Sequence, residues 1–336
     1  MTALDLDAAL PRSKIEILPA LTPLLVALVA APFIGSASTF VTLSAAGLAM
    51  GMLIFTMASG LTLVFGMMDV LNFGHGAFIA LGAYVATLVL LPLGNWSSAE
   101  SLALNLAVFL LAVVAAAIVC GALGFVFERL IVKPVYGQHL RQILATIGGS
   151  IIAEQLLYAI FGPDQIPLGL PKSFEGSFVF GEAAVEKYRL LATAVGLIVF
   201  VGEMLILNRS KIGLLIRAGV ENREMVEALG YRIDRLFVGV FMAGSALAGL
   251  GGAMMALYRG QAFATIGGEF LVLCFIVIII GGLGSVGGSF VASILVALIA
   301  NYAGFLMPKL ALVSNILAMV AVLLWRPRGL YPVSGR

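Results

Sequence analysis

Three polar side chains that could contact a small polar solute interrupt an otherwise apolar stretch. Asp69, Asn72 and His75 lie in the segment G-L-T-L-V-F-G-M-M-D-V-L-N-F-G-H-G-A-F-I-A-L-G-A-Y, which ends at Tyr84. The glycines around them let the backbone turn where a helix would otherwise continue. Polar groups at such a break are costly in lipid unless they face protein or a water-filled path. The stretch 59–84 therefore predicts a broken membrane helix that lines a passage.

Two of these side chains also have a purely structural interpretation. His75 either lines the path, which we favour, or packs against backbone groups that the break leaves without partners. Asn72 either faces the path or caps the helix that begins near Gly74, and the cap is the favoured role. The positive end of that helix would attract a passing carboxylate, whereas Asp69 would oppose it, so a neutral or cationic solute is conceivable.

The composition places these residues in an integral membrane protein. The chain has 336 residues, of which 62% are hydrophobic and 11% charged, against about 25% charged in a soluble domain. Its apolar runs are continuous over about 20 residues, as spanning helices require, and do not alternate as barrel strands do. Cys120 and Cys274 lie inside such runs and read as small buried residues, so neither a disulfide nor a metal site is predicted.

The apolar runs predict an all-α membrane fold of about ten transmembrane helices. The eighth run is short and ends in glycines, so it could be a half-crossing segment. A signal peptide competes for the first run, because Ser36-Ala37-Ser38 resembles a cleavage site, but we expect the run to be retained. The predicted spans are about 18–34, 39–66, 76–92, 102–127, 143–161, 188–207, 236–257, 270–281, 287–306 and 310–325.

The positions of lysine and arginine predict the orientation of these spans. The loops 128–142 and 208–235 and the tail carry clusters of these residues, and placing all three inside gives ten crossings with a cytoplasmic N-terminus. Segment 162–187 then lies outside, and its prolines and glycines predict an irregular loop. The chain divides into a cytoplasmic segment 1–17, a membrane domain 18–325 and a cytoplasmic tail 326–336.

A second glycine-rich break divides the C-terminal half. It reads G-G-L-G-S-V-G-G-S from Gly281 to Ser289 and interrupts an apolar stretch as the first break does. Two interruptions in different halves point to a translocation path between two half-repeats, although the sequence shows no clear repeat. The predicted path residues are Asp69, Asn72, Phe73, His75, Glu154, Gly281, Gly284 and Ser285.

Two glutamates and one row of small residues lie within other spans. Glu154 is well inside its span, where a bare carboxylate is costly, so we expect it to be protonated, to be paired or to face a polar cavity. Glu203 lies near the end of its span and is expected to reach the interface. In span 236–257 small residues recur every four positions, starting at Gly244, and predict close approach of a neighbouring helix.

The longest cytoplasmic loop, 208–235, predicts a short amphipathic helix that ends in glycine. Met225, Ala228 and Leu229 form an apolar stripe at helical spacing, and Gly230 is a suitable helix stop. Such a helix fits a groove on a partner protein. It equally fits a helix lying on the lipid surface. Its shape alone does not decide between the two.

These segments together resemble the branched-chain amino-acid (Liv-type) ABC permease family over roughly residues 40–330. The first break, the loop E-A-L-G-Y-R-I-D-R-L, the second break G-G-L-G-S-V-G-G-S-F and the tail R-P-R-G-L-Y-P all match that family. N-F-G-H-G is more similar to its H-type than to its M-type permeases. The resemblance implies a fold like that of type II ABC importers. The pattern differs at Asp69 and Ala77, which leaves the solute open among amino acids, urea, amides and small acids.

The resemblance also implies partners and a coupling site. It implies a second permease subunit (a paralogue or a second copy), separate ATPase subunits that bind ATP and Mg²⁺, a periplasmic solute-binding protein, and a place in the bacterial inner membrane. The loop 208–235 then becomes the ATPase-docking segment. Its expected coupling residues are Arg217, Arg223, Glu224, Glu227, Ala228 and Gly230.

The chain itself carries no nucleotide-binding or catalytic signature. No G-x-x-x-x-G-K-[ST] motif, nucleophile–base set or metal-ligand cluster occurs in it, so it is expected to be a transport subunit and not an enzyme. An ion-coupled secondary transporter that uses Asp69, His75 and Glu154 as a proton relay is the main alternative. A channel or a membrane scaffold without a transport cycle is the third.

Overall fold

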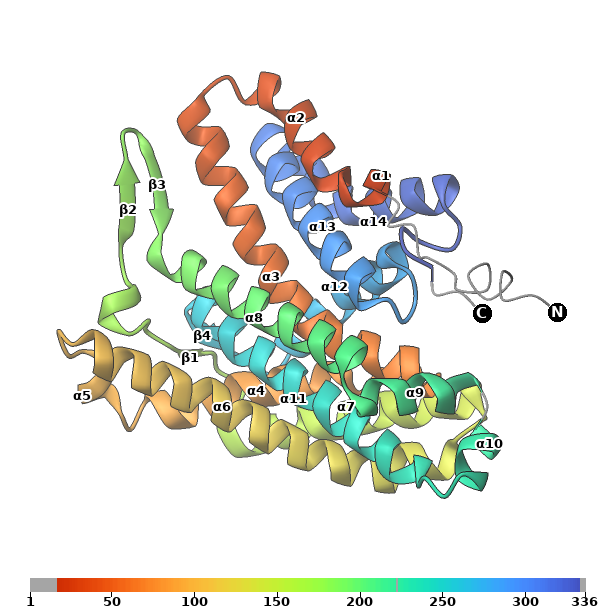
Figure 1. Ribbon diagram of the computed structural model, residues 1–336. Helices are drawn as coiled ribbons and strands as arrows, with labels where there is room; N and C mark the ends of the chain where they lie inside the picture. Colours follow the sequence, from red (N-terminus) through yellow and green to blue (C-terminus); the bar gives the residue numbers. More distant parts are fainter. Residues whose placement is uncertain (1–16, 222, 333–336) are drawn as a thin grey trace.

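The computed structural model describes residues 17–221 and 223–332, and the described chain is largely helical, as predicted (Figure 1). The helices before the external loop are α1 (Ile17–Ala20), α2 (Thr22–Ile34), α3 (Ala37–Met68), α4 (His75–Leu90), α5 (Gly94–Ser97), α6 (Leu102–Phe127), the π-helix η1 (Glu128–Val132), the 3-10 helix η2 (Lys133–Val135) and α7 (His139–Phe161). Those after it are α8 (Lys187–Arg209), α9 (Lys211–Glu221), α10 (Arg223–Ala228), α11 (Ile233–Arg259), α12 (Ile266–Gly281), α13 (Val286–Leu306) and α14 (Pro308–Trp325).

Each of the ten predicted spans coincides with an apolar helix. By length and composition, six helical segments of the described chain can cross a membrane: α3, α6 with η1 and η2, α7, α8, α11 and α13. Four shorter apolar segments lie in α2, α4, α12 and α14. The chain is thus an all-α multi-pass membrane protein, and the number of ten crossings stays a prediction.

Segment 162–187 is more regular than the sequence predicts. It contains β1 (Ile166–Pro167), the 3-10 helix η3 (Lys172–Phe174), and a hairpin of β2 (Ser177–Phe180) and β3 (Ala183–Glu186). Strand β1 pairs with β4 (Gln261–Ala262), which follows α11. The prediction of an irregular loop is wrong over the hairpin, where two four-residue strands pair antiparallel around a turn at Gly181, whose φ is +64°.

Helix α3 lies at the centre of the bundle. Every residue from Gly51 to Val64 is buried, and α3 packs against α8, α11 and α13. The close approach predicted for the small residues of span 236–257 is confirmed. A Cβ added at Gly244 would lie 2.7 Å from the carbonyl oxygen of Gly60 on α3. Helix α11 can contact α3 at this distance because neither residue has a side chain.

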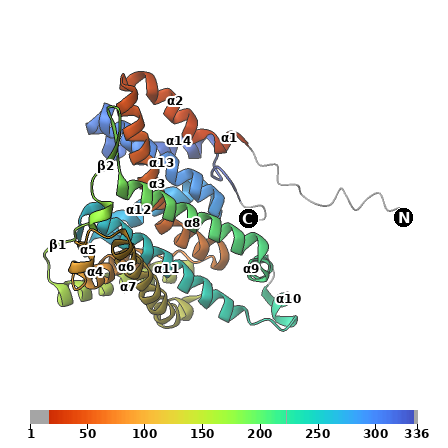
Figure 2. The same ribbon diagram turned by 60° about the vertical axis from the view of Figure 1, so that its left-hand side comes forward.

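Helix α8 runs from the β2–β3 hairpin to helices α9 and α10. The β2–β3 hairpin precedes it, whereas α9 and α10 follow it at the opposite end, in both views (Figure 1 and Figure 2). If the positively charged loops are cytoplasmic, the hairpin is external and α9 and α10 are internal. The predicted external and cytoplasmic loops therefore lie at opposite ends of one helix.

Candidate functional site

The first break occurs where the sequence predicts it. Helix α3 ends at Met68, and α4 begins at His75. Asp69 closes α3 with a φ of +53°, a left-handed conformation that Asp and Asn tolerate better than most residues with a side chain, and its amide donates to the Phe65 carbonyl oxygen at 3.0 Å. The helix is therefore interrupted at 69–74. That this interruption is re-entrant stays a prediction.

His75 is held by the backbone of α3. Its side chain is 0% exposed, and Nε2 donates to the Met57 carbonyl oxygen at 2.8 Å. Nε2 therefore carries the proton, and Nδ1 has no hydrogen-bond partner among the described residues. Of the two interpretations, the structure shows the packed histidine. A path-lining role for His75 stays a prediction.

Asn72 does not cap α4, so that prediction is wrong. The cap position is Gly74, with no side-chain hydrogen bond. The Asn72 side chain is buried, and neither its amide oxygen nor its amide nitrogen has a hydrogen-bond partner within the described part of the chain. A buried amide without partners costs free energy. Asn72 thus offers one donor and one acceptor group at the break.

Replacing His75 with alanine should destabilise the fold. The variant loses the Nε2 hydrogen bond and leaves a cavity between α3 and α4, which together cost about 2 kcal/mol. Denaturation of the detergent-solubilised protein, followed by near-UV circular dichroism, measures the loss. A His75→Gln variant keeps an N–H group that can donate to the Met57 carbonyl oxygen. It should therefore recover part of the lost stability. Equal loss in both variants would show that the hydrogen bond contributes little.

Phe73 connects the break to two further helices. Its amide donates to Thr146 Oγ1 on α7 at 3.2 Å, and its ring centroid lies 4.8 Å from that of Phe275 on α12.

Glu154 lies eight residues beyond Thr146 on α7, a distance of about 12 Å along the helix axis. It is half-buried, and no partner for it occurs among the described residues. Within the described residues, no hydrogen bond joins Asp69, His75 and Glu154 directly to one another, as a proton relay built from these three would require.

The second break also occurs in the predicted place. Helix α12 ends at Gly281, and α13 begins at Val286 after Ser285, whose hydroxyl accepts from the Gly288 amide at 3.1 Å. Gly282 and Gly284 have φ values of +102° and +83°, which favour glycine. Ser285 is therefore a helix cap, a role that the sequence analysis did not give it.

The two breaks are in contact with each other. A Cβ built on Gly66, in the last turn of α3, would lie 2.6 Å from Gly284 Cα, and a Cβ on Gly284 would lie 2.7 Å from Gly66 Cα. Near them, the hydroxyls of Thr62 and Ser289 are hydrogen-bonded at 2.7 Å. The structure thus brings Gly281, Gly284 and Ser285 to the end of α3 that carries Asp69. Glu154 is not part of this group.

The tail is hydrogen-bonded to the second break, a contact that the sequence did not predict. The amides of Leu330 and Tyr331 donate to the carbonyl oxygens of Ile280 and Gly281 at 2.8 and 3.0 Å. These are carbonyl groups in the last turn of α12, which have no partner within their own helix. Leu330 is 1% exposed. The motif R-P-R-G-L-Y-P was the available signal, because its glycine and proline predict a turn.

The predicted coupling loop is helical and ends at a glycine as expected. Gly230 has a φ of +88°, and its amide donates to the Glu227 carbonyl oxygen at 2.9 Å. The stripe residues Met225 and Leu229 are 57% and 72% exposed, so they are accessible to a partner. Of the other predicted coupling residues, Glu227 and Ala228 are exposed, whereas the side chains of Arg217, Arg223 and Glu224 lie outside the described part. Asn222 lies outside it altogether.

The inner side of this loop packs on the first break. Val226, Ile233 and Phe237 are buried together, and Met68, Leu215 and Ala218 pack against them. We call these six residues the coupling cluster. Met68 is the last residue of α3 and directly precedes Asp69. Helices α9 and α10 and the end of α3 therefore share one buried cluster.

Glu203 is buried, so the expectation that it reaches the interface is wrong. It lies on the face of α8 that also carries Phe200 and Met204, and that face packs on α3. Its side chain faces Ser59, whose hydroxyl is directed to the Thr56 carbonyl oxygen at 3.1 Å, and neither Glu203 oxygen is hydrogen-bonded among the described residues.

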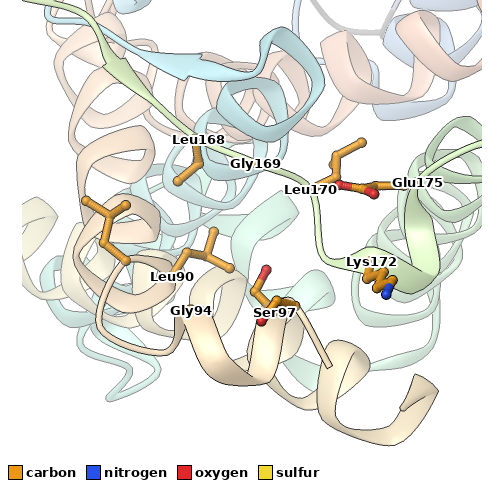
Figure 3. A pocket seen from close by; sticks show the side chains of 10 residues that line it. Leu90, Gly94, Ser97, Leu168, Gly169, Leu170, Lys172 and Glu175 are labelled. Atoms are coloured by element: carbon orange, nitrogen blue, oxygen red, sulfur yellow. The ribbon is translucent and has the colours of Figure 1, made fainter. Parts of the chain in front are cut away.

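A cavity lies at the end of the molecule that carries segment 162–187. It has a volume of about 430 Å³ and lies between the end of α4, helix α5 and the segment before β2 (Figure 3). Leu90 and Leu168 form apolar walls, and Lys172, which pairs with Glu100 at 2.8 Å, lies at its edge. This cavity contains none of the predicted path residues. It is therefore separate from the two breaks.

Comparison with known proteins gives the same family over most of the chain. Residues 43–324 match the model for the permease component of the branched-chain amino acid transport system. The chain is 27% identical over 291 residues to the high-affinity branched-chain amino acid transport system permease protein BraD of Pseudomonas aeruginosa, covering 84% of this chain and 93% of that protein.

Two further relatives have related names. LivH of Escherichia coli K12, a high-affinity branched-chain amino acid transport system permease protein, is 25% identical over 291 residues, or 84% of this chain and 92% of its own. A probable branched-chain amino acid transport permease protein LivH of Methanocaldococcus jannaschii is 26% identical over 293 residues, or 83% and 88%. No solved structure gives a significant match.

Proposed function

The chain belongs to the family of branched-chain amino-acid transport permeases, and from that premise we propose that it is the membrane subunit of an ABC importer. The proposed solute is a branched-chain amino acid or a related small polar molecule, carried across the bacterial inner membrane. The proposed partners are a second permease subunit, two ATPase subunits on the cytoplasmic side and a periplasmic solute-binding protein. ATP and Mg²⁺ would bind to the ATPase subunits.

The coupling cluster is the observation that carries this proposal. An ATPase bound to the exposed stripe of Met225 and Leu229 would move α10, whose buried residue Val226 belongs to the same cluster as Met68. From Met68 the displacement reaches Asp69 and, through Gly66, the second break at Gly284. One mechanical connection thus joins the docking surface to both breaks. Such a connection is what alternating access requires, because packed interfaces shift between discrete arrangements.

The mechanism then follows from the positions of the polar groups. The solute-binding protein delivers solute at the end of α8 that carries the β2–β3 hairpin. ATP closes the two ATPases, and the breaks separate so that Asn72 and the backbone groups of 69–74 become accessible to the solute. The unpartnered side-chain amide of Asn72 would then bind polar groups of the solute in place of water. Hydrolysis of ATP then lets the contact between Gly66 and Gly284 form again.

Reconstitution in liposomes with the cognate ATPase and binding protein tests the proposal. Uptake of radiolabelled leucine should require ATP and should stop when the ATPase is omitted. Uptake that persists on a proton gradient alone would support the ion-coupled alternative, in which Glu154→Gln stops transport. In the part of the chain that the structure describes, no direct hydrogen bond or ion pair links Asp69, His75 and Glu154 to one another, so nothing there supports that alternative.

A further inference from the structure

Glu203 is a buried acidic side chain that the proposed transport function does not use. It is 7% exposed, and neither of its carboxyl oxygens has a hydrogen-bond partner in the described part of the chain. It shares one face of α8 with Gly196 and Phe200, which precede it at helical spacing. A Cβ added at Gly196 would lie 2.6 Å from Met52 Cβ on α3. The Phe200 ring centroid lies 5.7 Å from that of Phe55 on the same helix, so the carboxyl group is enclosed where α8 packs closely on α3.

Three of the helices around Glu203 offer it no positive charge. Helix α3, which its side chain faces, has no ionisable residue between Ala37 and Met68. In α13 the only ionisable residue is Tyr302, whose hydroxyl is hydrogen-bonded to Ser44 near the start of α3. Helix α11 has no ionisable residue from 236 to 257. A carboxylate at this position would therefore face apolar side chains and hydroxyl groups.

The charged side chains of α8 and α9 do not neutralise Glu203 either. Arg209 ends α8 six residues later, about 9 Å along the helix axis, and is exposed. On α9, Lys211 is exposed, and the side chains of Arg217 and Glu221 lie outside the described part. The charged residues at the start of α8, in β3 and in η3 lie at the opposite end of the helix. Among the residues searched, no group of three or more His, Cys, Asp or Glu side chains could hold a metal ion.

A proton is the ligand that fits this environment. An unpaired carboxylate is costly to bury, whereas a carboxyl group that holds a proton is neutral. The protonated group can donate one hydrogen bond, and the Ser59 hydroxyl, which it faces, can accept it. That hydroxyl can still donate to the Thr56 carbonyl oxygen at 3.1 Å. A proton also needs no cavity, so the close packing of α8 on α3 does not exclude it.

We propose that Glu203 is a proton-binding residue, which holds its proton while α8 is packed on α3 and releases it when the two helices separate. In the release step the O–H bond of the carboxyl group breaks, the proton passes to water, and a hydrated carboxylate remains. No other bond changes. Water reaches the group from the end of α8 that carries the exposed Arg209.

Helix α9 is placed to bring about this separation. The hydroxyl of Ser210, between the two helices, accepts from the Gly213 amide at 3.2 Å. A Cβ added at Gly213 would collide with the Leu207 carbonyl oxygen, so the start of α9 lies directly on the last turn of α8. An ATPase that moved α9 would thus move α8 about one turn beyond Glu203. The proton would return when α8 packs again, so it would not be carried across the membrane. This consequence rests on the proposed function, whereas the proton site does not.

Infrared spectroscopy of the purified permease in nanodiscs detects the proton directly. The carbonyl stretching band of a protonated carboxyl group is separate from the bands of a carboxylate. The difference between the wild type and Glu203→Gln at neutral pH should contain the protonated band. Glu182→Gln, which changes an exposed glutamate in the hairpin turn, is the matched control and should show carboxylate bands. Carboxylate bands for Glu203 at neutral pH would overturn the proposal.

Ser59→Ala provides a second test that keeps the carboxyl group itself. It removes the hydroxyl that Glu203 faces, so the carbonyl band should shift in frequency. Ser44→Ala is its control on the same helix, because Ser44 is bonded to Tyr302 and should leave the band in place. An unshifted band in Ser59→Ala would also overturn the assignment.

Thermal unfolding measured against pH tests the link between the proton and the packing. The packed helices hold a proton that the unfolded chain gives to water, so raising the pH weakens the folded state, by up to about tenfold in the folding equilibrium per pH unit. The unfolding temperature of the wild type should therefore fall relative to that of Glu203→Gln as the pH rises. Glu182→Gln should follow the wild type. Parallel curves for the wild type and Glu203→Gln would contradict the link.

Uptake measurements separate failure of this inference from failure of the proposed function. In the complete complex with a non-hydrolysable ATP analogue, the protonated band should be lost, and its persistence would refute the release step. If Glu203 is ionised while leucine uptake still requires ATP, the proton site is refuted and the importer stands. If the band is present in the permease but no ATPase drives uptake, the proton site stands without the transport cycle.

Discussion

A Gly230→Pro variant is expected to reach the membrane and fold, but to lose its ATPase partner and its uptake activity. Gly230 has a φ of +88°, whereas proline is fixed near −65°. Proline also removes the amide that donates to the Glu227 carbonyl oxygen at 2.9 Å. The turn that follows α10 must therefore rearrange, and the exposed stripe of Met225 and Leu229 is displaced. Uptake should fall by about a hundredfold, equal to about 2.7 kcal/mol in the coupling step.

Co-purification with the tagged ATPase is the direct measurement. Gly230→Asn is the matched control, because asparagine tolerates the left-handed conformation and keeps the amide donor. A Cβ at this position would meet no atom within 4 Å, so the added side chain itself does not clash. Wild-type levels of bound ATPase in Gly230→Pro would contradict docking at this loop. Loss in both variants would show that the position tolerates no side chain in the complex.

The contact between the two breaks gives the second large effect. In Gly66→Ala the new Cβ would lie 2.6 Å from Gly284 Cα, a backbone atom that cannot rotate away. Either α3 or the second break must shift. Overpacking of this kind costs about 1–3 kcal/mol, and we expect the upper end because both partners are backbone. Both stability and leucine uptake should fall in the reconstituted protein.

Gly287→Ala provides the comparison within the same region. Its Cβ would meet nothing within 4 Å, and its φ does not lie in the left-handed region, so it should be close to neutral. Uptake and thermal unfolding of the two variants should be measured side by side. If Gly66→Ala retains both at the level of Gly287→Ala, the breaks do not depend on direct contact, and the connection from Met68 to Gly284 is refuted.

The sequence predicts local features of this fold well. The positions of the ten apolar runs, of both helix breaks and of the helix stop at Gly230 depend on glycine placement and hydropathy, which act over a few residues. The β2–β3 hairpin was missed because its strands are only four residues long and lie among prolines and glycines. Strands this short give little periodic signal.

The predictions about single side chains required contacts that the sequence does not contain. The prediction that Asn72 caps α4 is wrong because Gly74 takes the cap position. The prediction that Glu203 reaches the interface is wrong because the packing of α8 against α3 buries this side chain. The contact of Gly66 with Gly284 joins residues from different halves of the chain. Neither the family resemblance nor the spacing of residues could predict these tertiary contacts.

The hydrogen bonds of the tail also determine the order in which this protein can mature. Leu330 and Tyr331 donate hydrogen bonds to the last carbonyl groups of α12, but the ribosome makes α13 and α14 after α12 and before these two residues. A ribosome adds about 5–20 residues per second, so α12 and α13 enter the membrane seconds before their own end is closed. Chains released before Leu330 would carry exposed carbonyl groups at the second break. A product truncated before Leu330 would therefore expose the last turn of α12 to the proteases that remove unfinished membrane proteins.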